Sequence, residues 1–454
     1  MTVAVERPRP VPSARERALG LEFYVTEGPG IDGILKERPD DFRVNEISAY
    51  PRPDPEGAFT VLRVASRDWE QHELSQRLAA RLGLRPNALA WAGTKDRRAV
   101  AERLVSYRGL PPTGPIDLPG ATVLEQYRAR TGLVLGHHYG NAFFVRVRLA
   151  PGVAPDAAER AGAIHDELRR LGGCANLFGP QRFGEVRPIT HEVGRALVRG
   201  DPGRAVDLYL TEIPDGPAAV GDAARRTYAE THDALRALRE FPAHYRFERQ
   251  MLDHLARGQP PERALRALSR ELRMLFVHAY QALLFNRWVS RRHARGLSLL
   301  EPVEGDHLLR VTRDGTVPGV DPIPVSADNL PEASDLVRRS RARLAGPLVG
   351  LETPALAGEP GEILEGLLAE EAVRRADFGL PRFPEIASLG SWRPVWLPLP
   401  PIAVRTVAPG EGTPDGALDL VFSLPKGAYA TVLLREFLKT GSRPGASRGQ
   451  FSNT

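Results

Sequence analysis

The chain has 454 residues, which is enough for two or three domains, and its hydrophobic content of 42% is normal for globular cores. Its formal charge of +5, from 61 basic and 56 acidic residues, is compatible with a nucleic-acid partner but does not require one. The single cysteine, Cys174, excludes an intrachain disulfide and a cysteine-rich metal site, and we expect a small buried side chain there. No stretch approaches the roughly 18 apolar residues of a membrane span, so we expect a cytoplasmic protein.

Both ends of the chain have the composition of disordered segments. The first 17 residues carry prolines and charges but no apolar core, which excludes a secretory signal peptide. We therefore expect a disordered arm at residues 1–20. Glycine, serine and arginine dominate residues 441–454, which predicts a flexible tail.

The lysines are few. Arginine supplies 57 of the 61 basic residues, because lysine occurs only at Lys36, Lys95, Lys426 and Lys439. Such a bias is typical of a coding preference. A lysine that persists against it marks a position where a compact ammonium serves and a planar guanidinium does not, unless chance left it there. We use the lysines only as a pointer.

Two strands and a helix are predicted in the first 90 residues. Glycines and Pro29 indicate a turn, after which a short apolar segment leads to Lys36 and a second turn begins at Pro39. The alternation that follows predicts a strand with Phe42, Val44 and Glu46 on one side. Residues 58–64 form a second candidate strand. Leucines at helical spacing then predict a helix over residues 74–82, which ends at Gly83.

The stretch Trp91–Val100 places Asp96 among Lys95, Arg97 and Arg98. One interpretation is a basic surface turn whose aspartate neutralises its neighbours, and composition alone favours it. The other is a catalytic loop, because the cations favour the charged form of the carboxylate, which suits attack on a developing cation or proton removal beside one. The same cations would hold a polyanionic substrate. These ten residues leave both interpretations open.

Another strand, with clean alternation over residues 142–149, follows a turn that contains His137 and His138. Val145, Val147 and Leu149 are expected on one face, and the other face carries Phe144, Arg146 and Arg148. An aromatic ring with two arginines could bind RNA, although a solvated strand face is commoner. The two histidines lack further ligands at metal spacing, so we expect them to be structural or to face the substrate. A helix over residues 161–171 should end at Gly172.

The segment Asn176–Gly184 combines two aromatic residues, two side-chain amides and an arginine, with glycines between them. Phe178 is suited to stack on an extruded base, while Asn176, Gln181 and Arg182 fix loops and phosphates. Together with Gly93–Ala99, this segment resembles the TruD-type pseudouridine synthases, whose hallmarks are a Gly-x-Lys-Asp-Arg loop and an Asn-x-Phe-Gly-x-Gln-Arg-Phe-Gly segment.

Further segments match the family's pattern in the same order, so the resemblance spans about residues 21–437. They are Lys36–Phe42, Gly140–Phe143, Val277–Asn286, Leu424–Thr431 and Leu434–Glu436. Two positions depart from the pattern: Leu177 replaces an aromatic residue, and Ala282 stands where serine is usual. Neither position carries a proposed chemical role.

The resemblance implies an α+β fold. The pseudouridine-synthase catalytic core, with a mixed and mainly antiparallel sheet, should be discontinuous and comprise residues 21–187 and 385–440. An inserted α/β TruD-type domain should occupy residues 188–384. Within the inserted domain, the apolar pattern predicts a long helix from Leu272 to Trp288. After it, alternation at Leu418–Leu424 predicts a late strand that returns to the core and brings Lys426 with it.

The resemblance also implies an isomerase that breaks the N-glycosidic bond of a uridine in tRNA, rotates the base and rejoins it through carbon, with uridine 13 as the expected bacterial target. Asp96 matches the family's catalytic aspartate. The candidate substrate-binding residues are Phe178, Asn176, Lys36, Lys95, Arg97, Gln181 and Arg182. No cofactor or metal is required, tRNA is the expected partner, and we expect a monomer. Whether Asp96 adds covalently to the sugar or base, or removes a ribose proton to give a glycal, stays open.

Two interpretations within this set remain. Lys36 matches a family lysine near the catalytic aspartate, so its ammonium could pair with Asp96; the alternative is a phosphate contact at the edge of a groove. We also expect Asn176 to hold the Asp96 loop by hydrogen bonds. For the whole chain, the alternatives are a catalytically silent RNA-binding protein on the same fold and a base-excising hydrolase.

Overall fold

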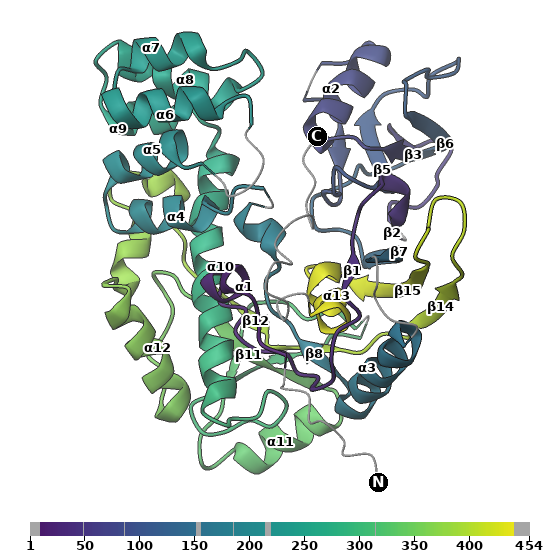
Figure 1. Ribbon diagram of the computed structural model, residues 1–454, viewed down its shortest axis with the longest axis vertical. Coiled ribbons are helices and arrows are strands. Elements are labelled where there is room, and N and C mark those ends of the chain that lie inside the picture. Colours follow the sequence, from purple (N-terminus) through teal and green to yellow (C-terminus); the bar gives the residue numbers. More distant parts are fainter. Residues whose placement is uncertain are drawn as a thin grey trace. The chain divides into compact units, whose positions relative to one another are not determined.

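The computed structural model describes residues 10–48, 50–85, 87–150, 156–184, 186–213, 219–313 and 315–439. These residues form two compact units (Figure 1). Of the described residues, the first contains Val25–Cys174 and Pro398–Lys439, and the second contains Val11–Tyr24 and Ala175–Leu397. The units divide by packing, so the family-based domain boundaries after residues 187 and 384 stay a prediction. The predicted flexible tail at 441–454 lies outside the described residues.

The first unit is built on a sheet with the strand order β14-β15-β7-β2-β5-β3-β6, to which β1 adds beside β7 and β4 beside β5. The pairing of β2 with β5 is parallel, and the other pairings described for this sheet are antiparallel. The predicted α+β class with a mixed, mainly antiparallel sheet is therefore confirmed. The strands are β1 Gly33–Ile34, β2 Phe42–Ile47, β3 Phe59–Arg67, β4 Ala90–Trp91, β5 Val100–Arg108, β6 Ala121–Ala129, β7 Gly140–Leu149, β14 Ala403–Val407 and β15 Ala417–Pro425.

Side-chain alternation decides which face of this sheet is covered. In β2, Phe42 and Val44 are buried whereas Arg43 and Asn45 are exposed, as the sequence predicts. In β7, Val145 and Val147 are fully buried. Arg148 differs from its predicted place beside Phe144 on an open face, because it is buried and forms two hydrogen bonds with the carboxylate of Asp41.

Among the described residues, three α-helices belong to the first unit. They are α2 Gln71–Arg81, α3 Ala157–Leu171 and α13 Ala430–Leu438. Leu78 of α2 packs against Leu62, Val64 and Val105 of the sheet, with Leu82 at the edge of this cluster, as the leucine spacing predicts. Helix α3 ends at Gly172, whose φ of 73° is the left-handed conformation that glycine adopts at helix ends.

The second unit is mainly helical. Its helices are α1 Ala14–Ala18, α4 Thr190–Val198, α5 Pro202–Thr211, α6 Asp222–Thr231, α7 Ala234–Glu240, α8 Arg246–Ala256, α9 Pro261–Arg266, α10 Arg270–Ala294, α11 Leu330–Arg338 and α12 Gly358–Glu370. Figure 1 shows α5–α9 gathered toward one end of the long helix α10. An antiparallel sheet has the order β10-β9-β11-β12, with β9 His307–Arg310, β10 Ile323–Pro324, β11 Ala342–Leu348 and β12 Ser391–Pro394. The short strands β8 Gly173–Ala175 and β13 Trp396–Pro398 lie where the chain passes between the units.

Helix α10 extends beyond the predicted Leu272–Trp288 at both ends and is buried along most of its length. The part of α10 beyond Trp288 includes a buried ion pair. Arg292 contacts Asp306 through two hydrogen bonds, and both side chains are 0% exposed. Among the described residues, no helix combines the length and apolarity needed to cross a membrane.

The predicted disordered arm at residues 1–20 differs from the structure over its second half. Residues 1–9 lie outside the described residues, but α1 is capped by Ser13, whose side chain accepts a hydrogen bond from the backbone of Glu16. Leu19 is buried, and its carbonyl accepts a hydrogen bond from Asn286 of α10. The apolar residue and the carbonyl contact hold this segment in place, which composition alone does not reveal.

Candidate functional site

The Asp96 loop, residues 92–99, joins β4 to β5 in the first unit. Space for a side chain is small at Gly93, because a Cβ atom would lie 3.0 Å from the His138 ring and 3.3 Å from the Lys95 ammonium. The loop therefore passes close to both groups. Asp96 itself is partly accessible, with 29% of its side chain exposed.

Lys36 contacts Asp96 across 60 positions of sequence. Its Nζ lies 3.2 Å from Asp96 Oδ2, and its side chain is only 5% exposed. The ammonium also lies 4.5 Å from the centroid of the Phe42 ring, a cation–π contact that offsets part of its desolvation. The contact predicted for Lys36 is thus present, and its role in chemistry stays a prediction.

The backbone at Lys36 is held in an uncommon conformation. Its φ of 53° lies in the left-handed region, which non-glycine residues rarely adopt. Such a conformation persists only where the surroundings enforce it. The surroundings here are the turn that follows, the 3₁₀ helix η1 Pro39–Asp41.

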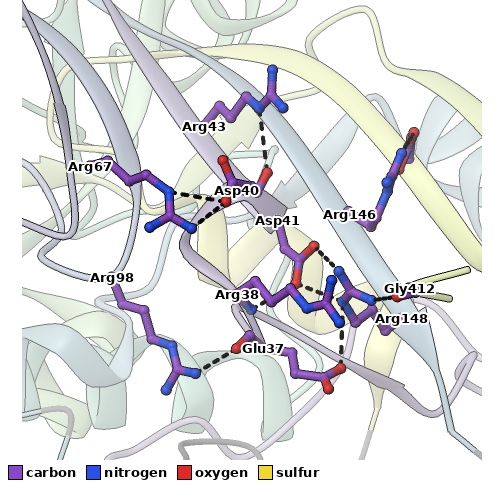
Figure 2. A network of polar contacts seen from close by, with 11 residues as sticks. Glu37, Arg38, Asp40, Asp41, Arg43, Arg67, Arg98, Arg146, Arg148 and Gly412 are labelled. Atoms are coloured by element: carbon purple, nitrogen blue, oxygen red, sulfur yellow. Dashed lines mark hydrogen bonds and ion pairs between the residues drawn. The ribbon is translucent and has the colours of Figure 1, made fainter. Parts of the chain in front are cut away.

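Asp41 is the centre of the network that fixes this turn (Figure 2). Its carboxylate accepts a hydrogen bond of 2.8 Å from the backbone N–H of Arg38 and two of 2.7 Å from Arg148 of β7. Arg148 also bonds the carbonyl of Gly412 and lies 3.5 Å from Glu37. A bidentate arginine–carboxylate pair of this kind is among the strongest polar contacts in proteins. The η1 turn, and with it Lys36, is thereby anchored to the central sheet.

Arginines outnumber carboxylates around the same turn (Figure 2). Arg67 binds Asp40 at 2.7 and 3.1 Å, and this contact holds the pKa of the Asp40 carboxyl below its usual value. Arg98 of the Asp96 loop donates to the carbonyl of Glu37 at 2.5 Å, and Arg43 to that of Asp40 at 3.4 Å. Arg97 is exposed. The turn beside Lys36 therefore presents an excess of positive charge.

Lys95 is placed differently from the substrate contact that the sequence predicts. Its Nζ lies 2.8 Å from Glu46 Oε2, and both side chains are only 2% exposed. Burial lowers the pKa of the Lys95 ammonium, which the Glu46 carboxylate opposes. Burial and the Lys95 charge also lower the pKa of neighbouring His138. In this structure Lys95 ties the Asp96 loop to β2 and offers no accessible charge to a ligand.

Three of the four lysines are enclosed. Lys36, Lys95 and Lys439 are all buried, and the Lys439 ammonium donates to the carbonyls of Thr26 and Gly28. Lys426 is exposed and donates to the carbonyl of Gly136 at 2.9 Å.

The remaining candidate residues belong to the second unit. Phe178 is 7% exposed, and its backbone N–H and C=O are both bonded by the carboxamide of Asn286 on α10, at 2.8 and 3.0 Å. The ring of Phe285 meets the Phe178 ring edge-on, with centroids 5.6 Å apart. The guanidinium of Arg393 lies over the Phe178 ring, 4.1 Å from its centroid.

Asn176 lies two residues before Phe178 and bonds to β12. Its Nδ2 donates to the carbonyl of Pro394 at 2.9 Å, and its Oδ1 accepts from Arg393 at 2.8 Å. Both polar atoms of the carboxamide therefore have partners on β12. The predicted hydrogen bonds of Asn176 to the Asp96 loop stay a prediction.

Gln181 and Arg182 lie on the 3₁₀ helix η2 Pro180–Phe183 and are half-buried. Arg182 is 5.8 Å from the centroid of the Phe178 ring. Burial and the charge of Arg182 lower the pKa of His278 on α10 to about 4. A neutral imidazole therefore lies near Arg182 at physiological pH.

Sequence reasoning missed three residues that organise these groups. Glu46 was placed on the covered side of β2 but not as the partner of Lys95, although a buried carboxylate needs a cation. The sequence gives Asn286 only as the last residue of a segment that matches the family's pattern, with no role. The sequence gives no indication of a role for Arg393, because it binds Asn176, which lies 217 residues away in sequence.

The two histidines, His137 and His138, have aromatic and backbone neighbours in the structure. The part of the chain that the structure describes contains no group of three or more His, Cys, Asp or Glu side chains that could hold a metal ion. His138 packs against Gly93, and His137 makes an edge-on contact with Tyr50.

The buried Lys95–Glu46 pair makes a stability prediction. Lys95→Met leaves a buried carboxylate without its cation, so we expect the free energy of unfolding to fall by about 3–5 kcal/mol. Urea denaturation measures this. Glu73→Gln is the matched control, because it removes an exposed pair with Arg77 whose loss should cost about 0–1 kcal/mol. Equal unfolding midpoints for the two variants would contradict the structural role assigned to Lys95.

Comparison with known proteins places these observations in a family. The sequence model described as tRNA pseudouridine synthase D (TruD) matches residues 18–437. A probable tRNA pseudouridine synthase D from Halobacterium salinarum is 39% identical over 438 residues, which cover 93% of this chain and 97% of the relative. One from Archaeoglobus fulgidus is 34% identical and covers 94% of this chain and 99% of its own length.

A solved structure agrees. The crystal structure of a Methanosarcina mazei protein named tRNA pseudouridine synthase D (TruD) superposes with a TM-score of 0.76 at 32% identity, and the match covers 93% of this chain and 97% of that one. The family model and the relatives both extend over nearly the whole chain. The chain therefore belongs to the tRNA pseudouridine synthase D (TruD) family.

Proposed function

We propose that this protein isomerises uridine to pseudouridine in tRNA, with uridine 13 as the target, and that the Asp96 carboxylate performs the chemistry. The observation that carries the proposal is the contact of 3.2 Å between the buried Lys36 ammonium and the partly exposed Asp96 carboxylate. Family membership supports the reaction and the tRNA substrate.

The reaction needs one well-placed carboxylate. The N1–C1′ bond of uridine breaks, the detached uracil rotates, and a C5–C1′ bond forms, after which C5 loses its proton and N1 regains one. No atom is added or removed overall. A carboxylate can form a transient covalent bond to the sugar or base, or remove a ribose proton, and either route uses the partly accessible carboxylate of Asp96. The ammonium of Lys36 lies 3.2 Å from Asp96 Oδ2 and orients this carboxylate.

The other candidate residues suit a flipped nucleotide and its backbone. An enzyme that acts on a base in folded RNA must extrude it, and an aromatic ring such as Phe178 provides a surface for stacking. Arg43 and Arg98 contact the turn that follows Lys36, and the exposed Arg97 is next to Asp96 in the chain. Their guanidinium groups are suited to phosphate. We assign backbone binding to these arginines, base binding to Phe178 and Asn176, and support of the Asp96 loop to Lys95.

The first functional prediction concerns Asp96. Asp96→Asn should abolish release of tritium from tRNA that contains [5-³H]uridine while leaving tRNA affinity nearly unchanged, because one carboxylate carries the chemistry and few phosphate contacts. Turnover within about tenfold of the parent, a barrier change of roughly 1.4 kcal/mol, would refute the assignment. Loss of base mass from the RNA, seen by mass spectrometry, would indicate a base-excising hydrolase instead.

The second concerns Lys36. If it orients Asp96, Lys36→Arg should slow turnover by more than about tenfold, because the planar guanidinium does not fit the enclosed site over Phe42. The salt dependence of tRNA binding should not change. If Lys36 only contacts a phosphate, Lys36→Arg should retain near-normal turnover, and Lys36→Ala should make the salt slope shallower by about one unit.

The third functional prediction concerns Phe178. The burial of Phe178 is also typical of a core residue that has no role in binding. Phe178→Leu removes the stacking surface and keeps most of the bulk, so turnover should fall by the equivalent of about 1–3 kcal/mol, whereas Phe178→Tyr should keep activity. Phe276→Leu is the control, since Phe276 is equally enclosed on α10 and packs against Tyr209. An activity loss that merely follows the loss of stability in both leucine variants would assign Phe178 to the core.

A further inference from the structure

Arg393 of β12 contacts both candidate base-binding residues of the second unit. Its Nε donates to the backbone carbonyl of Asn176 at 2.9 Å, and its Nη2 donates to the Asn176 side-chain oxygen at 2.8 Å. The same guanidinium lies 4.1 Å from the centroid of the Phe178 ring and 5.8 Å from that of Phe285. One side chain therefore fixes an amide by hydrogen bonds and covers an aromatic face.

These contacts leave the Asn176 carboxamide a single orientation. Its oxygen accepts from Arg393 and its nitrogen donates to the carbonyl of Pro394, so a flip of the amide would oppose donor to donor and acceptor to acceptor. The remaining N–H and lone pair then point in fixed directions. A uracil edge offers both carbonyl acceptors and an N3–H donor, so the orientation of a neighbouring amide decides whether the two match.

Phe178 is constrained by the same set of contacts. Asn286 holds its backbone at both polar atoms, Phe285 meets the edge of its ring, and Arg393 covers one of its two faces. Arg393 thus contacts the Phe178 ring as well as the Asn176 amide.

The strand that carries Arg393 is itself rigidly supported. Arg393 pairs with Gly346 of β11 in the antiparallel sheet. A Cβ atom at Gly346 would lie 2.9 Å from the Phe285 ring and 3.0 Å from that of Trp288, so only glycine allows β11 to approach α10 this closely. The backbone of Arg393 and the ring against which Phe178 packs therefore belong to one packed layer.

We propose that Arg393 is a positioning residue for uridine isomerisation, which fixes the Asn176 carboxamide and the Phe178 ring in the arrangement that receives the flipped uracil. This inference rests on the function proposed above. Arginine suits the role because its planar fork can donate two hydrogen bonds in one plane while its face stacks on a ring, and a lysine ammonium cannot do both. The competing role is a direct contact with an RNA phosphate, for which lysine would serve nearly as well.

The test is Arg393→Lys, assayed by single-turnover tritium release at saturating tRNA together with tRNA affinity at several salt concentrations. We expect the single-turnover rate to fall by about tenfold to a hundredfold, as displacement of a reacting group does, with tRNA affinity and its salt slope unchanged. Arg341→Lys is the matched control, because Arg341 is an exposed arginine just before β11, and it should behave as the parent.

A second variant tests whether Arg393 acts through Asn176. In an Asn176→Ala background, Arg393→Lys should lower the rate by a smaller factor than in the parent, because one of the groups that it positions is already gone. Full additivity of the two changes would overturn the proposal. So would a parental rate for Arg393→Lys, or a reduced affinity with a shallower salt slope, which would assign Arg393 to a phosphate.

Thermal unfolding separates these outcomes from a folding defect. If Arg393→Lys does not fold, Arg393→Gln takes its place, since it keeps a donor for Asn176 and loses the stacked cation. Failure of both variants to fold would make Arg393 a structural residue and overturn the proposal. Failure of the proposed function itself looks different, because the parent protein would then release no tritium.

Discussion

The proposed chemistry depends on an ion pair between a buried ammonium and a partly exposed carboxylate. Lys36 has little contact with water, yet its charge lies 3.2 Å from Asp96, of which 29% remains accessible. Enclosing a cation is costly unless a partner offsets the cost, and here an aspartate and the Phe42 ring both contribute. This arrangement leaves one oriented and partly accessible carboxylate in the loop.

Much of the first unit serves to hold that pair. The Asp41–Arg148 contact anchors the η1 turn to β7 and so enforces the left-handed backbone of Lys36. The contact between Lys95 and Glu46 anchors the Asp96 loop to β2. The second unit holds Phe178 and Asn176 through contacts of its own, with Asn286 on the backbone and Arg393 on the side chains. In each unit, long-range polar contacts immobilise short loop segments that carry the candidate functional groups.

Local patterns in the sequence predicted the local structure well. The alternation in β2 and in β7 as far as Val147, the leucine spacing of α2 and the glycine end of α3 each follow from one periodicity or one backbone preference, and the structure confirms them. The Lys36–Asp96 contact could be anticipated as well, since family resemblance and the scarcity of lysine both pointed to Lys36. Arg148 and Lys95 were expected to be accessible, but each binds a buried carboxylate from another part of the chain. The charge pattern along a strand or loop does not reveal such a partner. Arg393 could not be found, since its role arises from a strand paired far along the chain.

The central claim is that this protein converts one uridine of tRNA to pseudouridine, and carbodiimide mapping tests it most directly. An unmodified tRNA transcript is incubated with the purified protein, treated with carbodiimide and alkali, and read by primer extension. The account predicts a new stop at uridine 13, with the mass of the RNA unchanged. A transcript without any stop after exhaustive incubation, or one that has lost the mass of a base, would contradict it.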